Sequence, residues 1–171
     1  YNLTVFGSNW KIASNAMHFL DLWCYLNRSN QFELINSNVS KKLIPSKRKG
    51  YKEFYGFLTF QNINGALIHL NCFESDILWY QYSINNHEVN IDFNPLKNFA
   101  LFNLNKQSPE LLPFSEAPQS KLSNQYLKLL LDQKNLNLTD FQSSAEIHIT
   151  YLRSIIPLFN SLKQSQMIQI T

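Results

Sequence analysis

The sequence has few of the residues that define several specialised protein classes. It contains two cysteines, four glycines and six prolines, and charged residues make up 16% of its 171 positions. So few cysteines argue against a disulfide framework, and the net charge of +3 is too small to indicate a nucleic-acid-binding surface. The apolar stretches are too short to span a bilayer. We therefore expect a protein that binds neither nucleic acid nor a membrane.

Cys24 and Cys72 each lie inside an apolar segment and are far apart in the sequence. This placement is typical of reduced thiols, and no histidine or cysteine spacing indicates a metal site. No signal-peptide pattern opens the sequence, so we expect a cytoplasmic protein. The sequence begins at Tyr1 with a predicted strand, which favours a domain cut from a longer protein over a short processed start.

The residues that are abundant predict one folded domain over residues 1–171. Hydrophobic residues make up 44% and aromatic residues 14%, enough for one core. We expect a helix over 14–26, where helix formers follow Ser and Asn cap candidates, and a strand over 31–39. Residues 40–53 are expected to form a loop, because they contain proline, glycine and a basic cluster.

The middle of the sequence is rich in short runs of aromatic and β-branched residues. We predict an antiparallel meander of five strands over residues 54–60, 65–73, 77–84, 87–93 and 98–104. Asn64-Gly65 is the preferred pair for a type I′ turn between the first two strands. Along the third strand, Tyr80 and Tyr82 alternate with Trp79, which predicts one buried face and one mixed face.

Two helices are predicted near the end, one over 119–133 and one that begins at Thr139. Apolar residues recur along both at helical spacing, and Pro157 should kink or end the second. Residues 167–171 are predicted to add a short strand. The order of these elements indicates the α+β class, with an open, largely antiparallel β-sheet and helices packed on one face.

The first predicted helix carries a narrow polar stripe on an otherwise apolar surface. At about 100° per residue, Ser14, His18, Asp21 and Tyr25 share one direction. Such a helix should be buried, so the stripe must face either solvent or a cleft. At a solvated edge, Asp21 would only orient the imidazole. In a cleft, His18 would be a general acid or base, or a hydrogen-bond partner of a substrate.

Three segments resemble the C-terminal domain of the Gfo/Idh/MocA oxidoreductases, the family of glucose-fructose oxidoreductase and inositol dehydrogenase. GSNWKIASNAMHFLDLWCYL (7–26) resembles the family's glycine-containing loop and the helix that reads D-x-x-x-H-x-x-D. FYGFLTFQNINGALIHLNC (54–72) is similar to its paired strands around an N-G hairpin, and ITYLRSIIPLFNSL (149–162) to its late helix. The resemblance extends over nearly the whole chain.

The resemblance implies a substrate-binding domain whose partner is an N-terminal Rossmann domain of the same parent protein. In the family, that domain binds NAD or NADP and carries a catalytic lysine in an E-K-P-type motif. The four glycines of this chain form no G-x-G-x-x-G turn, and no Glu-Lys-Pro occurs. We therefore expect no cofactor-binding residue in this chain, and no hydride transfer by the chain alone.

Carried over by position, the family's catalytic histidine corresponds to His18, and Asp21 matches the aspartate one turn later. Ser14 departs from the pattern, because sugar dehydrogenases of the family often have an aspartate there. Asn15 is the nearest amide that could take over its hydrogen bonding. Neither Ser nor Asn titrates in a range useful for proton transfer, so this departure bears on activity.

Two residues of the preceding loop complete the candidate substrate site. Trp10 could stack on a sugar ring, although a lone aromatic is more often a packing residue. Lys11 could bind a phosphate or carboxylate.

Two hypotheses of different classes follow. In the first, the chain is the substrate-binding and oligomerisation domain of an NAD(P)-dependent oxidoreductase acting on a sugar or sugar derivative. The outer side of its sheet, with Tyr80, Tyr82 or Trp79, would then pack against another subunit. In the second, the chain is a non-catalytic ligand-binding or assembly module that kept the fold and lost the chemistry. Ser14 and the missing nucleotide domain favour the second hypothesis.

Overall fold

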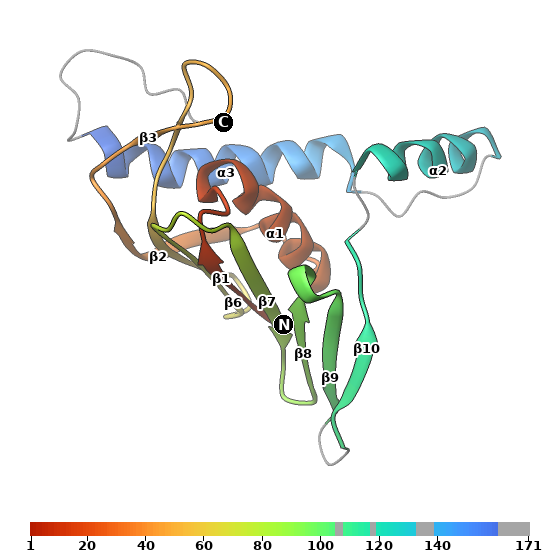
Figure 1. The fold of residues 1–171 in the computed structure, drawn as a ribbon. Helices are drawn as coiled ribbons and strands as arrows, with labels where there is room; N and C mark the ends of the chain where they lie inside the picture. The colour runs from red at the N-terminus through yellow and green to blue at the C-terminus, as the bar shows by residue number, and fades with distance from the viewer. Residues whose placement is uncertain (105–107, 117–118, 133–138, 161–171) are drawn as a thin grey trace.

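An eight-stranded sheet forms one layer of the structure, and helices cover one of its faces (Figure 1). The computed structural model describes residues 1–104, 108–116, 119–132 and 139–160. The strands of the sheet are β1 (Asn2–Ser8), β2 (Phe32–Val39), β5 (Gly56–Asn62), β6 (Leu67–Phe73), β7 (Trp79–Asn85), β8 (Val89–Asn94), β9 (Phe99–Leu104) and β10 (Glu110–Pro113). The α+β class and the largely antiparallel sheet are as predicted.

The first strand lies inside the sheet and interrupts the predicted meander. The strand order is β10-β9-β8-β7-β1-β6-β5-β2, so β6 and β7 do not pair with each other. Instead β1 pairs with β6 in parallel and with β7 in antiparallel orientation. Leu3 and Val5 of β1 are fully buried in the core on the inner face of the sheet. Turn residues indicate only which successive strands can form hairpins, and they contain no signal for this insertion.

Two helices cover the inner face of the sheet. α1 (Ile12–Asn27) contacts β1 and β6, and α3 (Phe141–Asn160) contacts α1 and β2. Their apolar faces and the inner face of the sheet form one core, which includes Trp23, Phe60 and Tyr151. α2 (Gln119–Leu131) extends to one side in Figure 1, and its Leu127, like Leu130 and Leu131, is more than half exposed.

Several predicted boundaries and local structures differ from the structure. α1 begins at Ile12, two residues earlier than expected. The expected loop over 40–53 contains a small hairpin of β3 (Ile44–Pro45) and β4 (Lys52–Glu53), and β10 was not predicted. α3 does not end at Pro157 but continues three residues further, to Asn160. The strand predicted over 167–171 lies outside the described residues.

The turn between β5 and β6 is not of type I′. That type needs positive φ at both central residues, whereas in this turn only Gly65 has it, at +81°. The side chain of Asn62 replaces part of the turn, since its Oδ1 accepts hydrogen bonds from the backbone N–H groups of Asn64 and Ala66.

The outer face of the sheet carries an aromatic cluster, which we define as Phe6, Phe73 and Trp79. Their ring centroids are 5.5 to 5.6 Å apart, and Phe6 is 41% exposed. Tyr80 and Tyr82 point to the opposite face, where both contact Phe19 of α1. The expectation that these tyrosines lie on the outer side is therefore wrong, whereas Trp79 does lie there.

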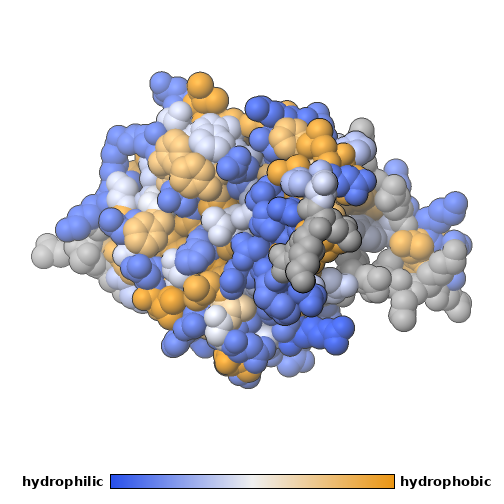
Figure 2. All heavy atoms as spheres, turned by 90° about the horizontal axis from the view of Figure 1, so that it is seen from below, coloured by the Kyte–Doolittle hydropathy of each residue, from blue (hydrophilic) through white to orange (hydrophobic). Residues whose placement is uncertain are grey.

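The surface seen from below alternates between hydrophobic and hydrophilic groups, with several separate apolar patches (Figure 2). None of the described helices is both long and apolar enough to cross a bilayer.

Candidate functional site

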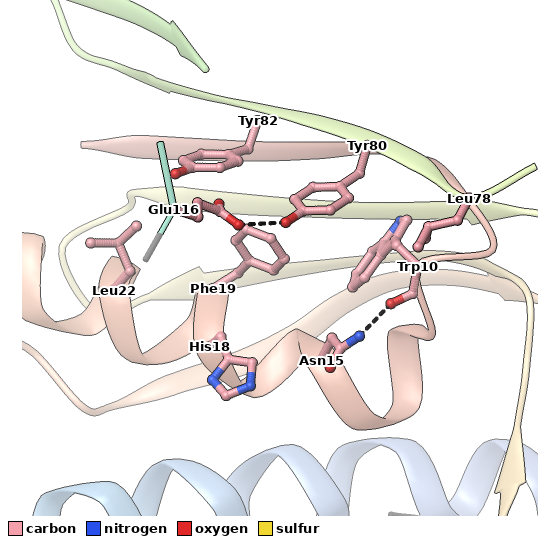
Figure 3. A pocket seen from close by; sticks show the side chains of 9 residues that line it. All are labelled: Trp10, Asn15, His18, Phe19, Leu22, Leu78, Tyr80, Tyr82 and Glu116. Carbon is pink, nitrogen blue, oxygen red and sulfur yellow. Dashed lines mark hydrogen bonds between the residues drawn. The ribbon is translucent and has the colours of Figure 1, made fainter. Parts of the chain in front are cut away.

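A cavity of about 510 Å³ lies between the first half of α1, β7 and the segment after β10. Its wall has four aromatic rings, two leucines and three polar side chains (Figure 3). The lining residues are Trp10, Asn15, His18, Phe19, Leu22, Leu78, Tyr80, Tyr82 and Glu116. A largely apolar wall with a few polar groups is typical of a small-molecule site.

Phe19 connects the helical wall of the cavity with its sheet wall. Its ring makes edge-type contacts with Trp10, Tyr80 and Tyr82, at centroid distances of 5.6, 6.1 and 5.4 Å. Trp10 is 2% exposed, and its Nε1–H donates to the carbonyl of Asn71 on β6 at 2.8 Å. The indole is therefore fixed by packing and by this hydrogen bond, and its contribution to the cavity is a rigid apolar wall.

The segment after β10 adds a carboxylate to the aromatic wall. The Tyr80 hydroxyl donates to Oε2 of Glu116 at 2.6 Å. Burial, reinforced by the Glu116 carboxylate, raises the pKa of both Tyr80 and Tyr82 well above the usual range of tyrosine. Both phenols therefore stay protonated at neutral pH. Glu116 accepts a hydrogen bond from the Tyr80 hydroxyl, and its carboxylate has further lone pairs that could accept hydrogen bonds.

His18 and Asn15 stand on α1 at the rim of the cavity. In Figure 3, Phe19 points from α1 towards the tyrosines, whereas His18 lies on the other side of the helix. His18 is exposed. Nδ2 of Asn15 donates to the carbonyl of Trp10 at 2.6 Å, so this amide secures the loop before α1 and keeps its oxygen available. Trp10, Asn15 and His18 are the sequence-predicted residues that the structure brings to the cavity.

Lys11, Ser14 and Asp21, also predicted, do not line it. The Lys11 ammonium donates to Oδ1 of Asn9 at 2.8 Å. Lys11 and Asn9 have positive φ, 65° and 54°. The loop before α1 therefore folds back, and the Lys11 ammonium lies against the Asn9 side chain. Asp21 lines a different hollow, towards α3, where its Oδ1 is buried without a hydrogen-bond partner among the described residues. No hydrogen bond joins the described side chains of Asp21 and His18, so the structure does not support the prediction that Asp21 orients the imidazole.

Ser14 is engaged by a buried carboxylate that sequence reasoning missed. Glu53 of β4 is 1% exposed; its Oε1 accepts from the Ser14 hydroxyl at 2.5 Å and its Oε2 from the Ala13 N–H at 2.9 Å. These bonds satisfy donors at the N-terminus of α1, where the helix dipole favours a negative charge. No local pattern in the sequence could indicate this, because the cap comes from a residue 39 positions away.

Among the residues that the structure describes, no three His, Cys, Asp or Glu side chains gather as a metal site would require. Tyr151 of α3 donates to the carbonyl of Ile12 at 3.0 Å, and burial raises its pKa. This bond and the Glu53 cap together fix the start of α1, and with it the position of the cavity rim.

No protein-family model and no curated protein sequence matches this chain. Solved structures do match. UDP-N-acetylglucosamine 3-dehydrogenase GnnA from Acidithiobacillus ferrooxidans is 11% identical, with a TM-score of 0.69 over 95% of this chain and 54% of that chain. Dehydrogenase MviM from Clostridium difficile is 13% identical, with a TM-score of 0.57 over 94% and 54%.

A third match is KijD10, a 3-ketoreductase from Actinomadura kijaniata whose structure contains NADP. It is 8% identical, with a TM-score of 0.56 over 88% of this chain and 50% of that chain. Identities this low establish the fold alone, and the chain spans about half the length of these proteins. These structural neighbours are Gfo/Idh/MocA-type oxidoreductases. This chain matches about half of each neighbour, which is consistent with a C-terminal domain without the Rossmann part.

Proposed function

We propose that this chain is the substrate-binding and oligomerisation domain of an NAD(P)-dependent oxidoreductase that acts on a sugar or sugar derivative. The observation that carries the proposal is the cavity with an aromatic wall and His18 at its rim, in a fold shared with about half of each neighbouring oxidoreductase. Aromatic walls suit the C–H faces of a pyranose ring, and a few polar groups suit its hydroxyls.

In this proposal His18 handles the proton of the substrate hydroxyl. Oxidation of an alcohol to a ketone releases a proton from that hydroxyl, and an exposed imidazole at the cavity rim is a suitable acceptor. Asn15, with its free amide oxygen, would help to orient the substrate. Trp10 would pack against the ring rather than stack freely on it, since its indole is already fixed.

The dinucleotide would be held by another domain of the parent protein. The chain's glycines, Gly7, Gly50, Gly56 and Gly65, are too far apart to form the turn that binds a pyrophosphate. We expect the isolated chain to bind no dinucleotide, and calorimetry with NADH checks this. Micromolar affinity would contradict the assignment of the cofactor site to a second domain.

Substitution of His18 in the full-length parent tests the catalytic assignment. For His18→Ala we expect turnover of a suitable sugar to fall by about 100-fold or more, because a positioned general base contributes at least that much. Binding of NAD(P) should not change. His87→Ala is the matched control, since this histidine lies in an exposed turn between β7 and β8. Unchanged turnover in His18→Ala would rule out the assigned role.

Oligomerisation is proposed through the outer face of the sheet. The aromatic cluster there is partly exposed, and its rings contact one another. Two copies of the cluster facing each other would make an isologous interface. We expect light scattering to show a dimer that Phe6→Glu weakens. Tyr25→Glu, at an exposed position of α1, should leave the dimer intact. A monomeric wild-type chain would contradict this part of the proposal.

The second candidate function is a non-catalytic ligand-binding or assembly module. It is favoured by Ser14, whose hydroxyl is bonded to Glu53 and does not line the cavity. The carboxylate of Glu53 is almost fully buried and does not replace an aspartate at the cavity. A full-length parent that binds a sugar but turns none over in the presence of NAD(P) would favour this function.

A further inference from the structure

Acceptors predominate among the hydrogen-bonding groups of the cavity. Glu116 offers carboxylate lone pairs, Asn15 an amide oxygen, and Tyr80 and Tyr82 their phenol oxygens. The donors are largely in use already: the Tyr80 hydroxyl is bonded to Glu116, and the Asn15 amide to the carbonyl of Trp10. A ligand that fits such a wall must itself supply the donors.

The charge of the cavity favours the same kind of ligand. With histidine neutral, Glu116 is the only charged side chain among the described lining residues. The nearest basic residue of the loop before α1, Lys11, is bonded to Asn9 and does not line the cavity. An anionic group in the cavity would therefore meet a carboxylate and no compensating cation from this part of the chain.

The surroundings of Glu116 in the cavity wall are mostly apolar. Besides Asn15 and His18, four aromatic rings and two leucines make up the wall, so the carboxylate, which is exposed to solvent, has few protein dipoles around it. The Tyr80 hydroxyl donates to the Glu116 carboxylate at 2.6 Å. This bond orients the carboxylate towards the part of the wall formed by Tyr80 and Tyr82. Charge-assisted hydrogen bonds from a ligand to such an oxygen are stronger than neutral ones.

We infer that this cavity selects donor-rich sugar rings that are neutral or carry an amino group, that it disfavours rings bearing a carboxylate or phosphate, and that Glu116 determines this selectivity. The inference rests on the proposed function, since it names the class of sugar that the same site takes. Any anionic part of a larger substrate would have to lie outside the cavity.

The test compares three pyranoses that differ in charge: D-glucosamine, D-glucose and D-glucuronate, each titrated at pH 7 into the full chain and followed by NMR. We expect glucosamine to bind best and glucuronate worst, with about fivefold in dissociation constant between neighbours in this order, the size expected for a partly exposed charge interaction. Glu116→Gln should bring the three constants to within about twofold. Glu110→Gln, an exposed carboxylate of β10 outside the cavity, should preserve the order.

The outcomes separate this inference from the proposed function. If all three sugars bind equally, or if glucuronate binds best, the selectivity is overturned while a sugar site stands. If Glu116→Gln keeps the wild-type order, the selectivity does not come from Glu116 and the inference fails. If none of the three sugars binds, both the sugar site and the inference are overturned.

Discussion

The two faces of the sheet use aromatic residues in different ways. On the inner face, Phe60 is fully buried and touches Phe32 and Tyr151, at centroid distances of 5.5 and 6.1 Å. On the outer face, the ring of Phe6 contacts the rings of Phe73 and Trp79 and stays 41% exposed. The same residue type thus stabilises the core on one side and leaves apolar surface exposed on the other. The cavity lies on the inner side, at the margin of the core.

The largest expected effect comes from replacing one phenylalanine on each face. Phe60→Ala should lower the free energy of unfolding by about 3–5 kcal/mol, because it leaves a cavity in the core. Phe6→Ala should cost about 1 kcal/mol or less in the monomer, since its ring is already partly solvated. Urea denaturation at low protein concentration measures both. Equal losses would show that the outer face is as well packed as the inner one.

A glycine on the inner face gives the next largest effect. A Cβ at Gly7 would collide with the backbone of β7, at the carbonyl of Trp79 and the Cα of Tyr80. Gly7→Ala should therefore cost about 2 kcal/mol and shift the cavity wall that carries Tyr80. In Gly65→Ala the new Cβ makes only an ordinary van der Waals contact with Nε2 of Gln61, so the positive φ is what opposes the substitution, at about 1 kcal/mol. A thermal melt that ranks Gly65→Ala as the worse variant would contradict the close approach of β1 and β7.

A pair of glutamates sharpens the contrast between a buried and an exposed carboxylate. Glu53→Gln removes one of the two acceptors that hold the start of α1, and should cost about 1–2 kcal/mol. Glu33→Gln, on the exposed edge strand β2, should change stability by less than about 0.5 kcal/mol. Denaturant midpoints compare the two variants. Equal denaturant midpoints for the two variants would contradict the role of Glu53 as the cap of α1.

Stability should also fall at high pH. Burial, with a contribution from the Asp21 charge, raises the pKa of the Cys24 thiol to about 12, and burial also raises the pKa of Tyr80 and Tyr82. A raised acid pKa means that the neutral form is favoured in the folded state, so this stabilisation is complete below pH 9 and falls as the pH rises from 9 towards 12. Unfolding curves at pH 8 and pH 10.5 measure it. Higher stability at pH 10.5 would contradict the burial of these groups.

The sequence allowed the fold class and both core helices to be predicted, because each depends on a periodic local pattern. The alternation along β7 predicted two different faces, but Tyr80 and Tyr82 were expected on the outer one and lie on the inner one. Of the polar stripe on α1, His18 lines the cavity, whereas Ser14, Asp21 and Tyr25 do not; Asn15, which the family resemblance indicated, also lines it. The stripe did not lead to the rest of the site, because Tyr80 comes from the sheet and Glu116 from the segment after β10, and no local spacing connects these residues to α1. The central position of β1 was also missed, since strand order depends on long-range pairing that hairpin signals do not report.

The proposed function requires that the cavity between α1 and β7 holds a sugar ring. Titration of the ¹⁵N-labelled chain with D-glucose, followed by amide chemical shifts, tests it most directly. We predict that the largest changes occur in residues 15–22 and 78–82, which form the two walls. Changes confined to the outer face around Phe6 and Phe73, with none along α1, would contradict the claim.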